Sequence, residues 1–79
     1  MDRAEILNKL TGIIKDVLDL DELILTDSTV AADVEGWDSL THITIIAEVE
    51  EAFDMKFPMK AVITMKNIGE MIDIIEKEV

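Results

Sequence analysis

The stretch EGWDSLTHITII, residues 35–46, marks the point where an irregular segment of the chain becomes an amphipathic helix. Two acids, a glycine and the only tryptophan precede Ser39, and apolar residues recur at helical spacing from Leu40 and Ile43 onward. Asp and Ser are both preferred at helix N-caps, so either Asp38 or Ser39 is expected to cap this helix. A serine at this place also lies where free N–H groups and the helix dipole favour a phosphate. The residue types alone leave both roles open.

The segment before this stretch is predicted to contain one long helix and a long connection. Apolar residues at helical spacing predict a helix over residues 3–18, and Asp2 and Glu5 have the spacing of a capping box at its start. Residues 19–37 show no sustained period. Connections of this length are usually functional or well packed. The aliphatic residues in this one favour packing, with one short helical turn at 30–34.

The segment after the serine is predicted to be mostly helical. A helix is expected over residues 38–53, and Pro58 fits the first position of a short helix over 59–64. Asn67 is a suitable cap for a last helix, which continues at least to Ile75. The pattern therefore predicts an all-α fold with three longer helices, a short third helix, a long loop between the first two, and no strand.

Composition and charge restrict the possible functions. The chain has 79 residues, 49% of them apolar and none of them cysteine, so residues 1–79 are expected to form a single domain with an aliphatic core. The formal charge of −11 disfavours binding to nucleic acid or to anionic lipid and favours partners with basic surfaces. No apolar run is long enough for a signal peptide or a membrane span. We expect a cytoplasmic protein with no membrane insertion. The segment 38–54 is the most acidic, with five acids and no base.

Enzymatic and metal-binding functions find little support. Asp38, Ser39 and His42 lie within one turn of a single helix start, where the aspartate would cap the helix and not orient the imidazole as a catalytic triad requires. His42 is expected to be a surface or boundary residue. No stretch has the ligand spacing of a calcium loop, and one His without Cys disfavours zinc. The protein is not expected to be an enzyme or to bind a metal.

The motif Gly36-Trp37-Asp38-Ser39-Leu40, followed by a helix that ends at Phe53-Asp54, resembles the acyl carrier protein family. The resemblance extends over nearly the whole chain and implies the four-helix bundle of that family. It also implies that Ser39, flanked by Asp38 and Leu40, carries a covalent 4'-phosphopantetheine group, which a phosphopantetheinyl transferase moves from coenzyme A. The thiol of that group would carry acyl groups as thioesters. The protein would then be a non-catalytic carrier, and we expect a monomer.

The resemblance also implies where partner enzymes bind. Acyl carrier proteins usually present acidic residues of the second helix to basic patches on loading enzymes and on downstream synthases or transferases. The corresponding acids in this chain are Glu48, Glu50, Glu51 and Asp54. Leu40 is the expected apolar contact beside the serine.

Several residues depart from the pattern of carriers in fatty-acid synthesis. Thr41 and Thr44 stand where those carriers tend to be acidic, and the short third helix has Lys60 and Lys66 nearby with no acid. These differences favour a stand-alone carrier of a dedicated pathway, such as polyketide or specialised lipid biosynthesis, over housekeeping fatty-acid biosynthesis. Met59 and Met65 are expected either to fill the core or to form an apolar patch that faces a partner.

Two alternatives remain open from the sequence. One is an aminoacyl or peptidyl carrier protein that an adenylating enzyme loads. The other is an unmodified helical adaptor that uses its acidic helix only for binding.

Overall fold

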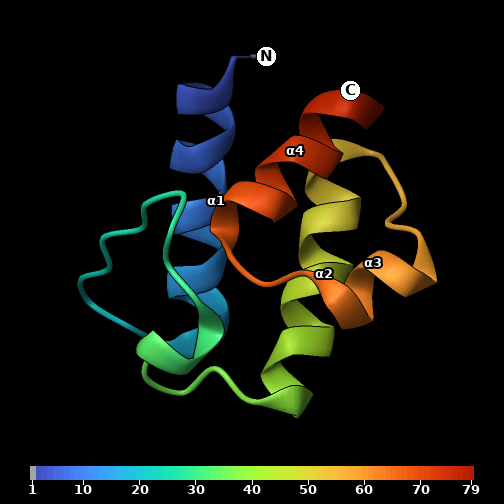
Figure 1. Ribbon diagram of the computed structural model, residues 1–79. Coiled ribbons are helices and arrows are strands. Elements are labelled where there is room, and N and C mark those ends of the chain that lie inside the picture. Colours follow the sequence, from blue (N-terminus) through green and yellow to red (C-terminus); the bar gives the residue numbers. More distant parts are fainter. Residues whose placement is uncertain (1) are drawn as a thin grey trace.

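Four α-helices and one short 3-10 turn make up the secondary structure of residues 2–79, the part of the chain that the computed structural model describes (Figure 1). The elements are α1 (Arg3–Leu18), η1 (Ala31–Asp33), α2 (Ser39–Phe53), α3 (Met59–Thr64) and α4 (Ile68–Glu78). This confirms the all-α class, the order of the elements and the short turn within the long connection. The last helix is longer than the apolar pattern required, because it continues past Ile75 to Glu78.

Side chains placed at the helix starts explain most of these boundaries. The Asp2 carboxylate accepts a hydrogen bond from the Glu5 N–H (2.8 Å), and the Asn67 side chain accepts one from the Glu70 N–H (2.9 Å). The expectation for Pro58 was wrong by one position, because this residue is the N-cap of α3 and Met59 is its first helical residue. Its extended ψ of 137° keeps it outside the helix.

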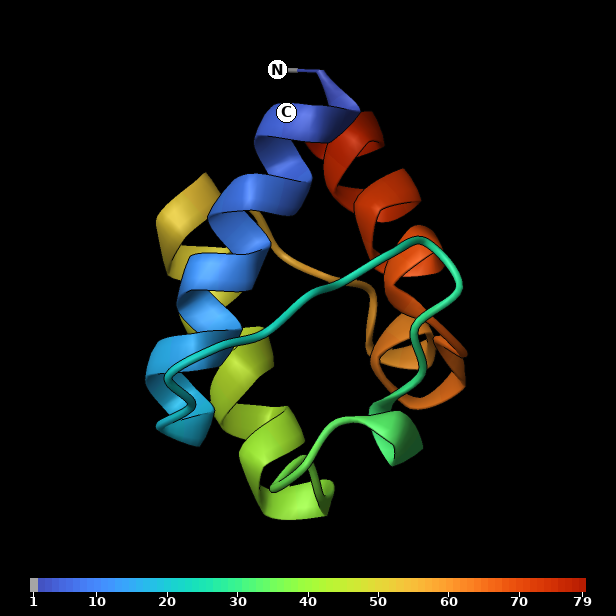
Figure 2. The same cartoon turned by 90° about the vertical axis from the view of Figure 1, so that its left-hand side faces the viewer.

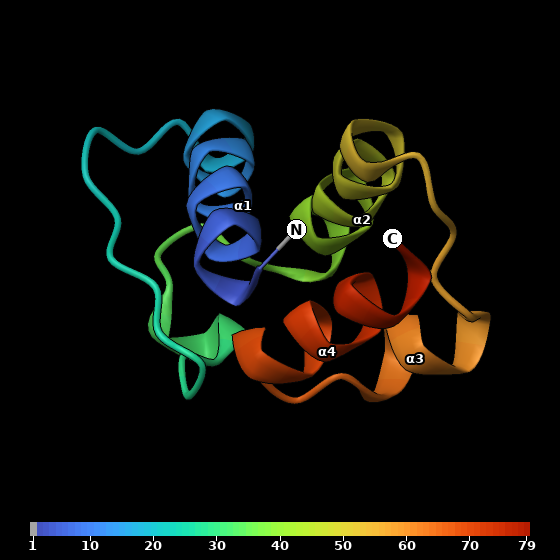
Figure 3. The same ribbon diagram turned by 90° about the horizontal axis from the view of Figure 1, so that it is seen from above.

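An aliphatic core joins α1 to two other helices. Helices α1 and α2 run antiparallel and side by side, and α4 lies across them (Figures 1 and 3). The fully buried side chains at the centre are Ile6, Leu10, Ile14, Ile45, Val49, Ile72 and Ile75. Removal of these aliphatic groups from water is the main stabilising contribution available to a chain without disulfides.

The long connection between α1 and α2 is fastened to the start of α4 (Figure 2). The Ile68 N–H donates to the Thr29 carbonyl oxygen (2.9 Å), and the Gly69 N–H donates to the Asp27 carbonyl oxygen (2.8 Å). The Arg3 guanidinium adds an ion pair to the Asp27 carboxylate (3.0 Å). These contacts hold η1 in place and thereby position the residues that lead into α2.

Helix α3 is the least anchored of the four α-helices. None of its six residues is buried, and no side chain caps its start. Val62, and Met65 just after the helix, pack partly against the core. Met59 is 81% exposed, so of the two alternatives for this residue a place in the core is wrong. No helix within residues 2–79 is both long and apolar enough to cross a lipid bilayer.

Candidate functional site

Ser39 is the first residue of α2, and its neighbour Asp38 is the N-cap. The Asp38 carboxylate accepts hydrogen bonds from the N–H groups of Leu40 and Thr41, both at 2.9 Å. The Thr41 hydroxyl accepts the Asp38 N–H in return (2.8 Å), which completes a capping box. Of the two possible caps in the sequence, Asp38 is therefore the one that the fold uses.

This capping arrangement leaves the Ser39 hydroxyl free. The residue is exposed, and its Oγ makes no hydrogen bond to any group within residues 2–79. Hydrogen bonds from the Thr41 and Leu40 N–H groups hold the pKa of the Asp38 carboxyl below its usual value of 3.8. Asp38 is therefore charged at neutral pH, directly beside an exposed and unengaged hydroxyl.

The same geometry changes the expected setting for a phosphate. Two of the N–H groups at the start of α2 are already bonded to Asp38. A phosphate on Ser39 would therefore have fewer free backbone donors than the sequence suggested and would lie mainly in water. It would still benefit from the dipole of α2, although the neighbouring carboxylate reduces this effect.

An apolar groove of about 510 Å³ begins at Ser39 and extends between η1, α2 and α3. We call it the outer groove. It is lined by Ala31, Ala32, Trp37, Asp38, Ser39, His42, Ile43, Val62, Ile63 and Met65. Ile43 is 61% exposed and Ile63 is 78% exposed. Leu40, directly after Ser39, is 81% exposed. Large apolar side chains are thus concentrated at the surface around the serine, as is typical of a binding surface.

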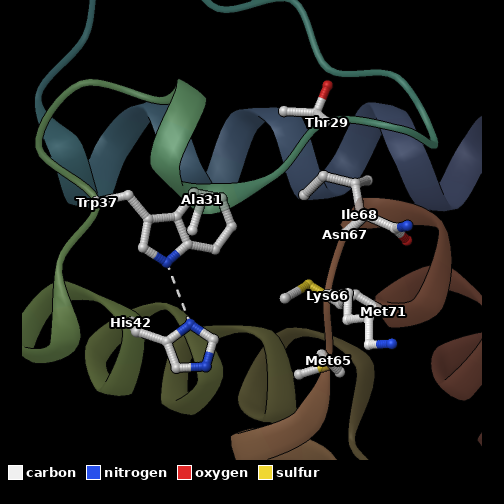
Figure 4. Close-up of a pocket in the computed structure, with 9 residues that line it drawn as sticks. All are labelled: Thr29, Ala31, Trp37, His42, Met65, Lys66, Asn67, Ile68 and Met71. Atoms are coloured by element: carbon white, nitrogen blue, oxygen red, sulfur yellow. Dashed lines mark hydrogen bonds between the residues drawn. The ribbon is translucent and has the colours of Figure 1, made fainter.

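His42 is more involved in the structure than its sequence context suggested. The Trp37 indole N–H donates to its Nδ1 (3.1 Å; Figure 4). Its Nε2 lies 3.0 Å from the Val62 carbonyl oxygen. Both ring nitrogens are therefore engaged, and neither is available as a base for Ser39. No local pattern in the sequence signals the contact with Val62, since this residue is 20 positions away.

The four acids predicted to bind partners do not share one environment. Glu48, Glu51 and Asp54 are exposed. Glu50 is turned toward the connection after α2, where its Oε2 accepts the Phe57 N–H (2.8 Å) and its side chain is only 19% exposed. Glu50 is therefore partly used to hold that connection in place.

Comparisons with known proteins agree with this geometry. The family described as "Phosphopantetheine attachment site" matches residues 8–75. The chain is 37% identical over 76 residues to the acyl carrier protein of Rubrobacter xylanophilus, and the match covers 95% of this chain and 93% of the relative. It is 36% identical over 78 residues to the acyl carrier protein of Borreliella burgdorferi, and this match covers 98% of the chain and 96% of the relative.

A solved structure is similar as well. The solution structure of the holo acyl carrier protein from Geobacter metallireducens has a TM-score of 0.84 and 36% sequence identity, and the match covers 91% of this chain and 83% of that one. The fold, the family match and the relatives thus lead to one assignment. The chain belongs to the acyl carrier protein family, whose members carry acyl groups on a phosphopantetheine prosthetic group and catalyse no reaction themselves.

Proposed function

We propose that Ser39 is the residue to which the phosphopantetheine group is attached. The observation that carries this proposal is the free, exposed hydroxyl at the first position of α2, beside a cap supplied entirely by Asp38. Modification of this hydroxyl would break no hydrogen bond of the fold. Ser28, the other serine of the sequence, differs because its Oγ lies 3.1 Å from the Thr26 hydroxyl.

The surroundings of Ser39 fit such a group. The hydroxyl lies at the edge of the outer groove, so a chain attached there has both open solvent and an apolar surface within reach. Asp38 fixes the start of α2, and Leu40 offers an exposed apolar contact to an approaching enzyme. When bound, the group supplies a terminal thiol that holds acyl groups as thioesters.

Intact mass spectrometry tests this attachment. After incubation with coenzyme A, magnesium and a broad-specificity phosphopantetheinyl transferase, the wild-type protein should gain the mass of one phosphopantetheine group. Ser39→Ala should gain nothing, while the control Ser28→Ala should gain the same mass as the wild type. No gain by the wild type, or a gain by Ser39→Ala, would exclude Ser39 as the attachment site.

We further propose that α2 is the surface at which partner enzymes bind. Acyl carrier proteins interact with phosphopantetheinyl transferases and with acyl-handling enzymes in general. The exposed acids Glu48, Glu51 and Asp54 support an electrostatic attraction to basic patches on such enzymes. Glu50 is expected to contribute less, because its carboxylate is partly buried and already bonded to the Phe57 N–H.

Charge reversal tests this surface. Glu51→Lys should slow the transfer reaction on Ser39 and weaken its dependence on salt, because exposed charges mainly raise the rate of encounter. Glu78→Lys makes the same change in net charge on an exposed residue at the end of α4 and is the matched control. Equal rates for the two variants at low salt would place recognition outside α2.

We also propose that the acyl groups belong to a dedicated biosynthetic pathway, such as polyketide or specialised lipid synthesis. Support comes from α3, which has exposed Met59 and Ile63, an exposed Lys60 and no acid. A partner that recognises an acidic third helix would bind this one poorly. In a malonyl-transfer assay with the malonyl transferase of fatty-acid synthesis, the holo protein should be a much weaker acceptor than the fatty-acid carrier. Equal acceptance would contradict the proposal, as would efficient loading by an amino-acid-adenylating enzyme.

A further inference from the structure

Four large apolar side chains form an exposed patch beside Ser39. They are Leu40 and Ile43 on α2, and Met59 and Ile63 on α3. Ile43 and Ile63 both line the outer groove, and Leu40 and Met59 lie one turn away from them along their helices. We call these four residues the α2–α3 patch. Within residues 2–79 only two other large apolar side chains are exposed, and both lie outside these helices, so the exposed apolar surface is concentrated here.

The α3 half of the patch is on the side of the helix that faces away from the core. Helix α3 lies at the edge of the bundle next to α2 (Figures 1 and 3). Val62, and Met65 just after the helix, supply the packing against the core. The His42 Nε2 lies 3.0 Å from the Val62 carbonyl oxygen and connects the two helices at the outer groove. The fold therefore makes no use of the exposed apolar side of α3, and a cluster of this kind is typical of an interaction surface.

The charge around α3 is opposite to that of the chain as a whole. Residues 55–69 are the longest stretch without an acid, and they contain Lys56, Lys60 and Lys66 in a chain of formal charge −11. Lys56 lies 4.0 Å from the Glu50 carboxylate. Lys60 and Lys66 are exposed and form no ion pair within residues 2–79. Unpaired positive charge therefore accompanies the apolar side chains of α3 and attracts acidic groups.

The α2 half of the patch has charge of the other sign. Residues 38–54 contain five acids and no base, and the charged Asp38 lies two positions before Leu40. The patch is thus negative along α2 and positive along α3. Charges of both signs fix the orientation of a partner, because a reversed partner would bring like charges together.

We propose that the α2–α3 patch is the docking site of an acyl-handling enzyme whose contact surface is apolar at its centre, basic where it faces α2 and acidic where it faces α3. Lys60 selects this enzyme, because it attracts an acidic rim and repels a basic one. The outer groove connects the patch to Ser39, so an enzyme bound there has the attached group within reach. This inference deepens the docking at α2 proposed above and rests on the attachment at Ser39.

A second copy of this chain is the other candidate for the patch. The formal charge of −11 on each copy opposes such an association. Size-exclusion chromatography with light scattering should therefore give the mass of a monomer for the loaded protein. A dimer that Ile63→Ser dissociates would assign the patch to a second copy and overturn the proposal.

Two synthetic probes test the charge pattern. Both are amphipathic helical peptides with the same leucine face, and the remaining positions are glutamate in one and lysine in the other. In NMR spectra of the isotope-labelled protein, the acidic peptide should shift the amide signals of Met59, Lys60 and Ile63. The basic peptide should shift those of the C-terminal half of α2. Signals of α3 that the acidic peptide leaves unchanged would refute the proposal.

Charge reversal identifies the residue responsible. Lys60→Glu should weaken binding of the acidic peptide several-fold. Lys77→Glu makes the same change in net charge on an exposed residue of α4 and is the matched control, which should bind as the wild type does. Equal weakening by the two variants would show that only net charge matters. Ile63→Ser should weaken both peptides without lowering the urea midpoint, because this side chain is exposed. Unchanged binding of both peptides to this variant would refute the apolar contact.

The malonyl transferase of fatty-acid synthesis tests the same selection with an enzyme, since a basic docking surface is expected on it. Holo Lys60→Glu should accept the malonyl group several-fold faster than the holo wild type at low salt, and the gain should shrink at high salt. Lys77→Glu should stay near the wild type. Damage to the fold would lower acceptance and cannot produce this gain. Equal rates for Lys60→Glu and the wild type would overturn the selective role of Lys60.

The outcomes separate this inference from the functions on which it rests. If the wild type gains no mass with the phosphopantetheinyl transferase, the attachment at Ser39 fails, and the docking role fails with it before any charge variant is compared. If loading succeeds and Glu51→Lys slows transfer, but Lys60→Glu changes neither peptide binding nor malonyl acceptance, the docking at α2 stands and the role of α3 is refuted.

Discussion

Replacement of Glu50 by alanine should destabilise the protein, whereas the same change at its neighbour Glu51 should not. The two glutamates are adjacent on α2 and look equivalent in the sequence. In the fold, Glu50 Oε2 accepts the Phe57 N–H at 2.8 Å, and Phe57 is a core residue that is only 6% exposed. Glu51 is exposed and makes no such contact.

The size of the effect follows from the group left without a partner. A buried N–H that loses its acceptor costs about 1–3 kcal/mol, and partial access to water at this position places the expected loss near 1–2 kcal/mol. Glu51→Ala should change the free energy of unfolding by less than about 0.5 kcal/mol. Glu50→Gln keeps an oxygen acceptor but loses the charge, so its loss should be intermediate.

Urea unfolding followed by far-UV circular dichroism measures these differences. With an m-value of roughly 1 kcal/mol/M for a chain of this size, the midpoint of Glu50→Ala should fall by about 1–2 M. The midpoint of Glu51→Ala should stay near that of the wild type. Equal midpoints for the two alanine variants would show that the contact with Phe57 does not stabilise the fold. Glu50 would then be as available for partner binding as Glu51.

Four other predictions follow from contacts elsewhere in the structure. Gly12→Ala should raise the free energy of unfolding by about 0.5–1 kcal/mol, because nothing lies within 4 Å of the added Cβ and the helix gains from alanine. Gly69→Ala should lower it by about 1–3 kcal/mol in the same urea assay, because its Cβ would lie 3.0 Å from the Asp27 carbonyl oxygen, which is backbone and yields little. Asp38→Asn should destabilise the protein at pH 6, and the difference in free energy of unfolding between the variant and the wild type should shrink as the pH falls below about 4. The reason is that the pKa of Asp38 is lowered in the folded state. Its stabilising contribution is therefore present above the ordinary pKa of 3.8 and is lost as the pH falls through the folded-state pKa. A difference that stays constant between pH 6 and pH 3 would contradict this. Arg3→Gln should lower the melting temperature more at low salt than at high salt, because its guanidinium is paired with Asp27, Asp73 and Glu76 at the surface, and Lys77→Gln should show no such salt dependence.

The helices were predictable because local rules determine them. Aliphatic residues at helical spacing and the caps Asp2 and Asn67 lie within a few positions of the boundaries that they define. The identity of the cap of α2 was not predictable, since Asp38 and Ser39 are equally good capping residues. Only the hydrogen bonds to the Leu40 and Thr41 N–H groups distinguish them.

The remaining features of the site depend on contacts between distant residues. The Val62 carbonyl oxygen that His42 contacts belongs to a residue 20 positions away in the sequence, and the Phe57 N–H that Glu50 binds belongs to one seven positions away. Neither contact has a periodic signature. Met59 was expected in the core because it is apolar, but a helix of six residues without any buried side chain leaves it at the surface. Burial in so short a helix is decided by its neighbours.

Asp38 and Ser39 are neighbours with different roles: Asp38 caps α2, and Ser39 is its first residue with a free hydroxyl. If Ser39 were the cap, its oxygen would be needed by the N–H groups of the first turn, and a group attached to that oxygen would compete with the start of the helix. Because Asp38 bonds to two of those N–H groups and Thr41 completes the capping box, the helix starts at Ser39 without using its side chain. The serine is thus held at a fixed place in the fold while its hydroxyl stays available. If Ser39 carries the phosphopantetheine group, as proposed above, this combination presents the group to several enzymes at the same position.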